Sequence, residues 1–317
     1  MNIQPIETVQ LGKTDVHVTP LGVGTWQWGD SMFWGYGRGY AEDEIRTAFD
    51  ASLAAGINFF DSAEIYGQGR SERFLGRFIG TNGSRPLVAT KFMPFPWRLG
   101  KGALVAALHN SLARLGLAQV DLYQIHWPMP PVPIETWADA LADAVAAGLT
   151  KAVGVSNYNA DQTRRAHAVL ARRGVPLASN QVEYSLLHRD LERNGLLYTC
   201  QDLGVALIAY SPLAKGMLTG KYTPDSPPPG LRGRRYRGGF LAGIHPLLGL
   251  LREIGQAHSG RTPSQIALNW VISKGVIPIP GAKNAQQARD NAGALGWRLT
   301  PDEIGALDGA SDRLNTK

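Results

Sequence analysis

The stretches LVATKF at residues 87–92 and DLYQIHW at residues 121–127 frame the part of the sequence that decides the fold. Both are short and largely apolar, as is typical of strands covered on both faces of a parallel sheet. An apolar stripe at helical spacing lies between them, formed by Leu104, Leu108, Leu112 and Leu115. Residues 87–127 therefore predict one strand–helix–strand unit.

The same alternation continues along nearly the whole chain. Eight strand-like runs are separated by helical patterns, and the runs are Leu21–Thr25, Asn58–Ser62, Leu87–Phe92, Asp121–Trp127, Ala152–Ser156, Ser179–Glu183, Ala206–Tyr210 and Val276–Pro280. Capping boxes with a proline in the first turn predict the start of two helices near the C-terminus, at Thr262–Gln265 and Thr300–Glu303. Strict alternation of eight strands with helices favours an α/β fold, a closed (β/α)8 TIM barrel, with a doubly wound open sheet as the alternative.

Two segments lie outside this alternation. Residues 9–18, with a turn sequence at Gly12–Asp15, are expected to form an N-terminal β-hairpin that caps the bottom of the barrel. Residues 215–243 are rich in Pro, Gly and Arg and predict a long mobile loop after the seventh strand. We also expect extra helices beside the eight-fold pattern. No linker composition divides residues 1–317, so a single domain is expected.

Composition narrows the class of protein and its partners. Apolar residues make up 44% of the chain, and the single cysteine excludes an intramolecular disulfide. Neither a secretory signal nor an apolar run of ~18 residues is found, so we expect a soluble, cytoplasmic protein without a membrane partner. The net charge is +6, and Arg232–Arg237 is either a nucleic-acid patch or, as we favour, a solvated loop. The oligomeric state stays open.

Ionisable residues stand where three consecutive strands end. Asp61 closes the second predicted strand, Lys91 the third and His126 the fourth, and Tyr66 follows Asp61 by five residues. Each has an ordinary alternative, as a helix cap, a surface charge, a core histidine or a loop cover. Because barrel enzymes carry their active sites at the carboxyl ends of the strands, we predict that the four side chains meet there.

The four groups together suit the reduction of a carbonyl. A phenol with a pKa near 10 is a weak acid at neutral pH, and a neighbouring ammonium group lowers that pKa. A carboxylate holds the ammonium charged and oriented, while an imidazole hydrogen-bonds the substrate oxygen. The quartet would donate a proton to oxygen as a hydride reaches carbon.

Other chemistries find little support in the sequence. The seven histidines show no metal-ligand spacing, so no metal is expected. Gly154–Tyr158 lacks the closing glycine of a nucleophile elbow, and neither a P-loop nor a GxGxxG motif is present. A nicotinamide cofactor would need binding residues other than a Rossmann fingerprint.

In their order and spacing, the motifs of this chain resemble those of the aldo-keto reductases over nearly its whole length. The likeness rests on LGVGTW (21–26), FDSAEIYG (60–67), TK (90–91), DLYQIHW (121–127), GVSN (154–157), NQVEY (180–184), AYSPL (209–213) and IPG (279–281).

The resemblance implies a (β/α)8 barrel that reduces aldehydes or ketones with NADPH. It implies a catalytic tetrad in which Tyr66 is the general acid, Lys91 tunes its pKa, Asp61 supports Lys91 and His126 orients the carbonyl. The cofactor-binding residues that it implies are Thr25, Trp26, Ser156, Asn157, Gln181, Tyr210, Ser211, Leu213, Lys215, Gly216, Pro280, Gly281, Lys283, Gln287 and Asn291.

Within this set, the resemblance also implies individual roles. Ser156, Asn157 and Gln181 would hold the carboxamide and Tyr210 would stack on the nicotinamide ring. The segment Ser211–Gly216 would fold over the pyrophosphate, with an ordinary mobile loop as the alternative.

The adenine end carries one departure from the family pattern. Lys283, with Asn284, would contact the 2′-phosphate, and Gln287 and Asn291 would face the adenine. Many relatives have an arginine at the position of Gln287, and a neutral amide cannot supply that charge. NADPH preference would then depend on Lys283, with NADH as a weaker alternative cofactor.

Aromatic residues follow several of the predicted strands. Trp26, Trp34, Phe95 and Trp127 would give the substrate site apolar walls suited to a hydrophobic or aromatic carbonyl compound, unless they only pack the barrel top. Two other functions remain open. One is a cofactor-binding regulatory module like the channel β-subunits, and the other is a phosphate-binding barrel enzyme, such as an isomerase, that uses Lys91 and His126.

Overall fold

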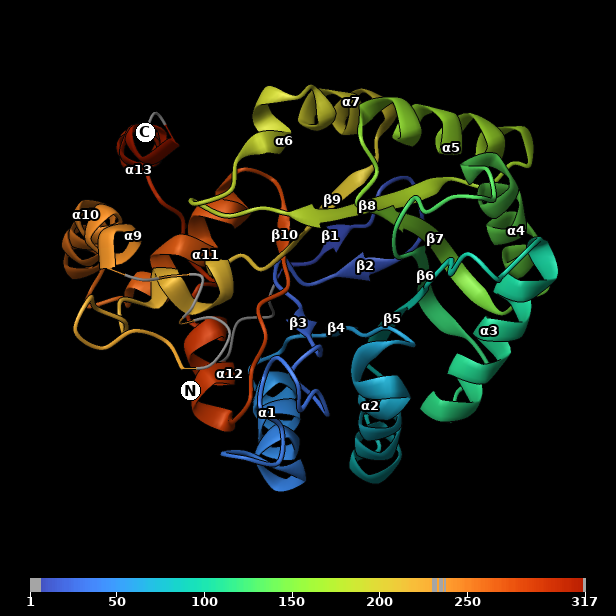
Figure 1. Cartoon of the computed structure of the whole chain (residues 1–317), viewed down its shortest axis with the longest axis horizontal. Coiled ribbons are helices and arrows are strands. Elements are labelled where there is room, and N and C mark those ends of the chain that lie inside the picture. Colours follow the sequence, from blue (N-terminus) through green and yellow to red (C-terminus); the bar gives the residue numbers. More distant parts are fainter. Residues whose placement is uncertain (1–6, 230–232, 234–235, 237, 316–317) are drawn as a thin grey trace.

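The computed structural model describes residues 7–229, 233, 236 and 238–315. Eight parallel strands lie side by side in the order of the chain, with helices around them (Figure 1). They are β3 (Val23–Gly24), β4 (Phe59–Asp61), β5 (Leu87–Phe92), β6 (Val120–Ile125), β7 (Thr150–Ser156), β8 (Leu177–Glu183), β9 (Ala206–Tyr210) and β10 (Ile277–Pro278). Each falls within or overlaps one of the eight predicted runs.

The sheet closes on itself between its first and last strands. Gly24 forms a parallel bridge with Gly281, and its N–H donates to the Pro280 carbonyl at 3.1 Å. A Cβ on Gly24 would lie 2.8 Å from the Ile279 carbonyl oxygen, so this close approach requires glycine. The predicted (β/α)8 barrel is confirmed, and the open doubly wound sheet is wrong.

Helices form the outer layer of the barrel (Figure 1). They are α1 (Glu42–Ala54), η1 (Tyr66–Gly69), α2 (Arg70–Asn82), α3 (Lys101–Leu115), α4 (Ile134–Ala146), α5 (Ala160–Arg172), α6 (Asp190–Arg193), α7 (Leu196–Leu203), η2 (Ala214–Thr219), α9 (Gly238–Gly243), α10 (His245–Ala257), α11 (Pro263–Ser273), α12 (Ala285–Ala292) and α13 (Pro301–Asn315). Among the described residues, no helix is both long and apolar enough to pass through a membrane.

The sequence signals for individual helices are confirmed by their contacts. The four leucines of the α3 stripe are all buried. Thr262 accepts a hydrogen bond from the Gln265 N–H, and the Gln265 side chain accepts one from the Thr262 N–H. Thr300 and Glu303 exchange the same pair of bonds at the start of α13. Both capping boxes therefore begin helices where predicted.

The predicted hairpin is present before the barrel. β1 (Val9–Gln10) and β2 (His17–Val18) pair antiparallel, and Leu11, Val16 and Val18 pack in a cluster with residues from the barrel strands, including Phe59 and Ala178. Since Ala178 lies near the start of β8, the hairpin covers the amino-terminal end of the barrel. The apolar interior of the barrel is closed at this end.

Residues 215–243 contain more regular structure than a loop. The 3-10 helix η2 and the α-helix α9 lie at its two ends, so the prediction of a long loop is wrong for these parts. Apart from Gly233 and Tyr236, the segment Arg232–Arg237 lies outside the described residues.

Candidate active site

Three neighbouring strands bring the predicted quartet together. Asp61 is the last residue of β4, Lys91 is the fifth residue of β5, and His126 directly follows β6. Tyr66 begins η1 in the connection between β4 and α2. The four side chains meet at the carboxyl end of the barrel, as the sequence predicts.

A buried ion pair forms the base of this site. The Lys91 ammonium donates to Asp61 Oδ1, to the Ser62 carbonyl at 2.7 Å and to the Tyr66 hydroxyl at 3.4 Å. An ammonium group has three N–H donors, so all three have partners here. Lys91 and Asp61 are almost completely buried. The lysine is therefore fixed in position by its own hydrogen bonds.

Two glutamine amides complete the surroundings of the carboxylate. Asp61 Oδ2 accepts hydrogen bonds from Gln124 Nε2 at 3.1 Å and from Gln181 Nε2 at 2.9 Å. Sequence reasoning assigned Gln181 to the cofactor and missed Gln124. The signal for Gln124 was present, because it stands two residues before His126 and side chains two apart on a strand share a face.

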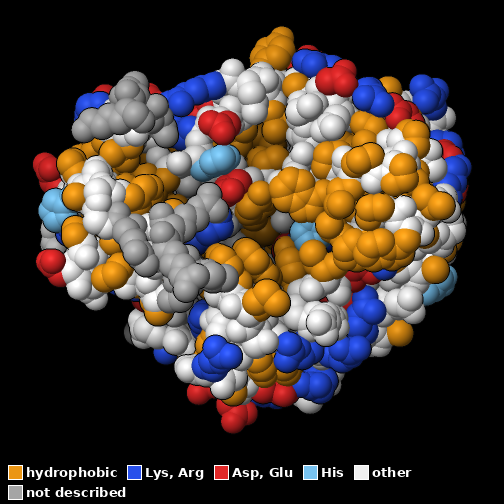
Figure 2. Space-filling view, viewed as in Figure 1, with side chains coloured by type: hydrophobic (Ala, Val, Ile, Leu, Met, Phe, Trp, Pro, Cys, Tyr) orange, Lys and Arg blue, Asp and Glu red, His pale blue; other side chains and the backbone are white. Residues whose placement is uncertain are grey.

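The phenol lies between aromatic neighbours. The Tyr66 and His126 rings meet edge to face with centroids 5.7 Å apart, and Trp26 lies 6.2 Å from Tyr66 on another side. Tyr66 is partly exposed, whereas His126 is buried and its Nδ1 has no hydrogen-bond partner within the described part of the chain. Figure 2 shows a hollow over the region where the barrel lies, with hydrophobic side chains along much of its rim.

The electrostatic balance of the site differs in one respect from the expectation. Burial raises the pKa of the Tyr66 phenol above its ordinary value, and the Lys91 ammonium, which lowers it, does not offset this fully. Burial works to lower the pKa of Lys91, but the Asp61 carboxylate and the Tyr66 phenol leave it raised. Burial, and then the Lys91 charge, hold the pKa of His126 well below its ordinary value. At neutral pH the phenol is protonated, the lysine charged and the imidazole neutral.

The residues predicted to hold the carboxamide form a connected network. Asn157 has a left-handed backbone (φ 63°), and its side-chain amide donates to the His126 carbonyl and the Ser156 hydroxyl, each at 3.0 Å. Its Oδ1 accepts from the Tyr210 hydroxyl at 2.9 Å, and Ser156 donates to the Gln181 carbonyl at 2.8 Å. The structure therefore brings these four residues together beside His126.

The segment predicted for the pyrophosphate has an unusual backbone. Ser211, Lys215 and Gly216 all have positive φ, at 51°, 57° and 95°. Lys215 pairs with Glu183 at 2.9 Å, a partner that sequence reasoning missed, and Leu213 precedes η2. A folded loop with a partly buried lysine thus follows β9.

At the predicted adenine end, Lys283 is already well ordered by its surroundings. Its ammonium donates to the Trp34 carbonyl at 2.9 Å and lies 4.1 Å from the centroid of the Tyr40 ring. Gln287 Oε1 accepts the Lys283 N–H at 2.9 Å, and the Asn291 amide donates to the Gly281 carbonyl at 3.3 Å. These side chains therefore line one continuous stretch from the end of β10 to α12.

Three other predicted cofactor residues take part in the barrel itself. The Thr25 hydroxyl donates to the Asp61 carbonyl at 3.0 Å, and Pro280 and Gly281 make the contacts that close the sheet against Gly24. Their contacts in the structure give each of them a structural role.

The predicted substrate aromatics divide into two groups. Trp26 and Trp34 meet edge to face at 5.5 Å, so Trp34 reaches Tyr66 through Trp26. Phe95 stacks on Trp97 at 4.6 Å, and Trp97 is 72% exposed. Trp127 is also exposed.

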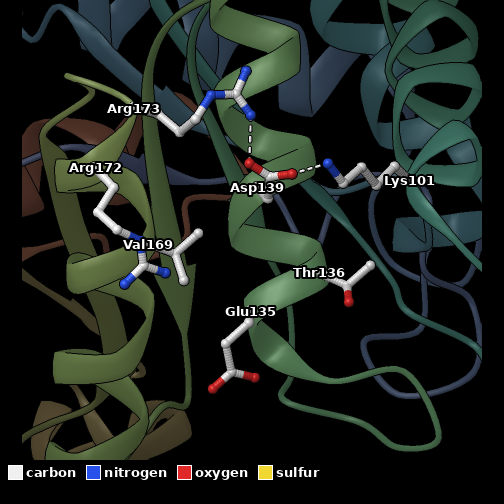
Figure 3. A pocket seen from close by; sticks show the side chains of 7 residues that line it. All are labelled: Lys101, Glu135, Thr136, Asp139, Val169, Arg172 and Arg173. Carbon is white, nitrogen blue, oxygen red and sulfur yellow. Dashed lines mark hydrogen bonds and ion pairs between the residues drawn. The ribbon is translucent and has the colours of Figure 1, made fainter.

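A separate hollow of about 300 Å³ lies on the helical wall of the barrel (Figure 3). It is lined by Lys101, Glu135, Thr136, Asp139, Val169, Arg172 and Arg173. Asp139 pairs with both Lys101 and Arg173, and these charged groups link α3, α4 and the end of α5. Within the described ranges, no cluster of three or more His, Cys, Asp or Glu side chains is arranged to hold a metal ion.

Comparison with known proteins agrees with this geometry. The model of the aldo/keto reductase family matches residues 20–312. The chain is 44% identical over 313 residues to the chloroplastic pyridoxal reductase of Arabidopsis thaliana. The aligned region covers 94% of this chain and 84% of the relative.

Two solved structures share the fold over almost their whole length. A glycerol dehydrogenase from Gluconobacter oxydans superimposes with a TM-score of 0.86 at 26% identity, covering 99% of this chain and 98% of that one. A thermostable aldo-keto reductase in complex with the inhibitor epalrestat gives a TM-score of 0.77 at 32% identity, covering 96% and 99%. The chain therefore belongs to the aldo/keto reductase family.

Proposed function

We propose that this protein reduces aldehydes or ketones to alcohols with NADPH, and that Tyr66 donates the proton. The observation that carries the proposal is the contact of the Tyr66 hydroxyl with the buried Lys91 ammonium, 3.4 Å away, next to His126. The contact supports the proposal because a phenol, an ammonium charge that would stabilise its conjugate base and a neutral imidazole surround one point. Such a constellation suits an oxygen atom that gains negative charge during the reaction.

The residues present fit a nicotinamide dinucleotide. Lys215 and Lys283 would provide two cations for its phosphate groups. For its carboxamide, Asn157 would provide an amide beside His126 and Gln181 a second amide, which contacts Asp61. When bound, NADPH supplies the hydride that reduces the carbonyl carbon. Ser156 and Tyr210 would help to hold the ring end, because both already bond to this amide network.

The proton transfer follows from the charges at the site. The raised pKa of Tyr66 keeps the phenol protonated until the carbonyl oxygen becomes an alkoxide, which is a much stronger base. Lys91 then stabilises the phenolate, and Asp61 keeps the lysine charged and in place. The neutral His126 ring would donate a hydrogen bond to the same oxygen.

The substrate class follows from the apolar rim. Trp26, Trp34, Phe95 and Trp127 would form apolar walls around a planar ring, so we propose aromatic aldehydes. Pyridoxal is the first compound to test, because the relative from A. thaliana is named a pyridoxal reductase. The name of that relative also describes it as chloroplastic. For this chain, a cytoplasmic location stays a prediction. Its organisation as a single domain stays a prediction too.

Loss of NADPH absorbance during incubation with pyridoxal, 4-nitrobenzaldehyde and related aldehydes tests the proposal. Turnover supports a reductase. Tight NADPH binding without turnover across the panel would favour a regulatory module instead. Failure of NADPH to quench the fluorescence of the eight tryptophans would favour a barrel enzyme that uses no nicotinamide.

We expect Lys283 to set the cofactor preference. A charge-assisted hydrogen bond contributes about 1.5–3 kcal/mol, so Lys283→Ala should weaken NADPH binding about tenfold or more. NADH lacks the 2′-phosphate and should bind almost as before. Fluorescence titration with both cofactors measures the difference. Lys151→Ala, at the start of β7, is the matched control, and an equal loss for NADPH and NADH in Lys283→Ala would contradict the role.

A further inference from the structure

The position of the Tyr66 hydroxyl depends on the loop that carries it. Its hydrogen bond to Lys91 is long, at 3.4 Å. The next two residues, Gly67 and Gln68, both have a left-handed backbone, with φ of 54° and 58°. A non-glycine residue in this region costs on the order of 1–3 kcal/mol and keeps its conformation only where surrounding contacts impose it. Something outside the phenol must therefore hold the loop.

Glu64, two residues before Tyr66, supplies such contacts. Its Oε1 accepts hydrogen bonds from the Met93 N–H at 2.7 Å and from Arg98 Nη1 at 2.5 Å. Its Oε2 accepts from Arg98 Nη2 at 3.1 Å, and its own N–H donates to the Lys91 carbonyl at 3.3 Å. The Glu64 side chain is only 9% exposed, so water does little to weaken these bonds.

Arg98 joins the same contacts from the connection after β5. Its Nη1 also donates to the Met93 carbonyl at 2.9 Å. Its guanidinium lies 4.9 Å from the centroid of the Phe92 ring and 5.5 Å from that of Phe95. Arg98 therefore contacts the residue after Lys91 and one of the predicted substrate aromatics at once.

We infer that the Glu64–Arg98 ion pair positions Tyr66 against Lys91. The inference rests on the proposed function. Glu64 belongs to the short segment between Asp61 and Tyr66, and Met93 follows Lys91 by two residues, so the pair ties the loop of the proton donor to the strand of the ammonium group. Neither Glu64 nor Arg98 is assigned a place in the proton transfer. They are positioning residues, and the ion pair is hereafter the Glu64–Arg98 clamp.

Two properties of the clamp could position Tyr66, its paired hydrogen bonds and its opposite charges. A two-bond contact between a guanidinium and a carboxylate fixes orientation as well as distance, which a single ammonium contact does not. Arg98→Lys would keep the charge and lose the paired bonds. Glu64→Gln would keep an acceptor for the Met93 N–H and lose the charge. The two conservative changes thus separate geometry from charge.

We expect Glu64→Leu and Arg98→Met to slow the reaction without weakening cofactor binding. A misplacement of about 1 Å at a reacting group can cost about 100-fold, so the hydride-transfer rate should fall about 10- to 100-fold. The rate should fall less in Glu64→Gln and in Arg98→Lys. NADPH affinity, measured by fluorescence quenching, should stay near the wild-type value. The clamp lies after β4 and β5, whereas most of the predicted cofactor residues lie in or after β7 to β10.

The decisive measurement is a single-turnover experiment with enzyme in excess over NADPH and saturating aldehyde. Because NADPH is limiting, it stays fully bound as long as folded protein exceeds it, so a partial loss of folded protein leaves the rate constant of NADPH consumption unchanged. A misplaced Tyr66 lowers that rate constant. Glu42→Leu is the matched control, since it removes an exposed glutamate–arginine pair, Glu42–Arg77, between α1 and α2. Its rate constant should equal that of the wild type.

The outcomes separate the two proposals. If the wild-type protein transfers the hydride and Glu64→Leu does so with the same rate constant, the positioning role of the clamp is wrong and the proposed function is unaffected. If Glu64→Leu does not fold, Glu64→Gln and Arg98→Lys decide in the same way. Wild-type protein that binds NADPH but transfers nothing overturns the proposed function, and the clamp falls with it.

Discussion

Replacing Tyr66 by phenylalanine is expected to lower kcat about 10²- to 10⁴-fold, the usual contribution of a positioned proton donor. Phenylalanine keeps the ring that packs against Trp26 and His126 and removes only the hydroxyl that contacts Lys91. Binding of the cofactor does not need that hydroxyl, so the NADPH affinity should change little. Steady-state kinetics with pyridoxal and a fluorescence titration with NADPH give the two values.

Tyr198→Phe is the matched control for this change. Tyr198 is 71% exposed on α7, on the outside of the barrel, so the variant should keep the wild-type kcat. A Tyr66→Phe enzyme with more than about a tenth of the wild-type kcat would show that another group supplies the proton.

Asp61→Asn is expected to destabilise the protein and to remove most of its activity. The side chain keeps its shape, but the buried Lys91 ammonium loses its countercharge. Breaking a buried ion pair in this way costs about 3–5 kcal/mol, or else the lysine loses its proton and can no longer stabilise the phenolate. Urea unfolding measures the first effect, and kcat measures the second.

An exposed pair provides the comparison for Asp61. Glu42→Gln breaks the Glu42–Arg77 contact, whose side chains are about half exposed, and should cost at most about 1 kcal/mol. A loss for Asp61→Asn as small as this, with unchanged kcat, would contradict the supporting role of the carboxylate.

Much of the fold could be predicted because its signals are local. The leucine stripe of α3 and the two capping boxes each lie within one helix, and the structure has them as predicted. The strand runs are apolar because both faces of a barrel strand are covered. The structure of residues 215–243 was harder to predict. Their Gly, Pro and Arg content indicates a loop, although η2 and α9 form at the two ends of this segment.

The quartet could be predicted because each member ends or follows a strand, and parallel strands end at one edge. The network around it could not. The Gln124 and Gln181 amides reach Asp61 from β6 and β8. The spacing of Gln124 and His126 indicates that they share a face of the strand, but not that Gln124 contacts Asp61. The direction of the Tyr66 pKa also depends on burial, which raises it more than the Lys91 charge lowers it. Sequence alone shows that the charge is near, but not how much water is excluded.

The most direct test of the proposed chemistry follows the hydrogen atom itself. The protein is incubated with pyridoxal and NADPH that carries deuterium at the transferred position of carbon 4, and the product alcohol is examined by mass spectrometry and NMR. We predict one deuterium on the carbinol carbon of each product molecule and a solvent-derived proton on its oxygen. Product without deuterium, or no product although NADPH is bound, would contradict the account.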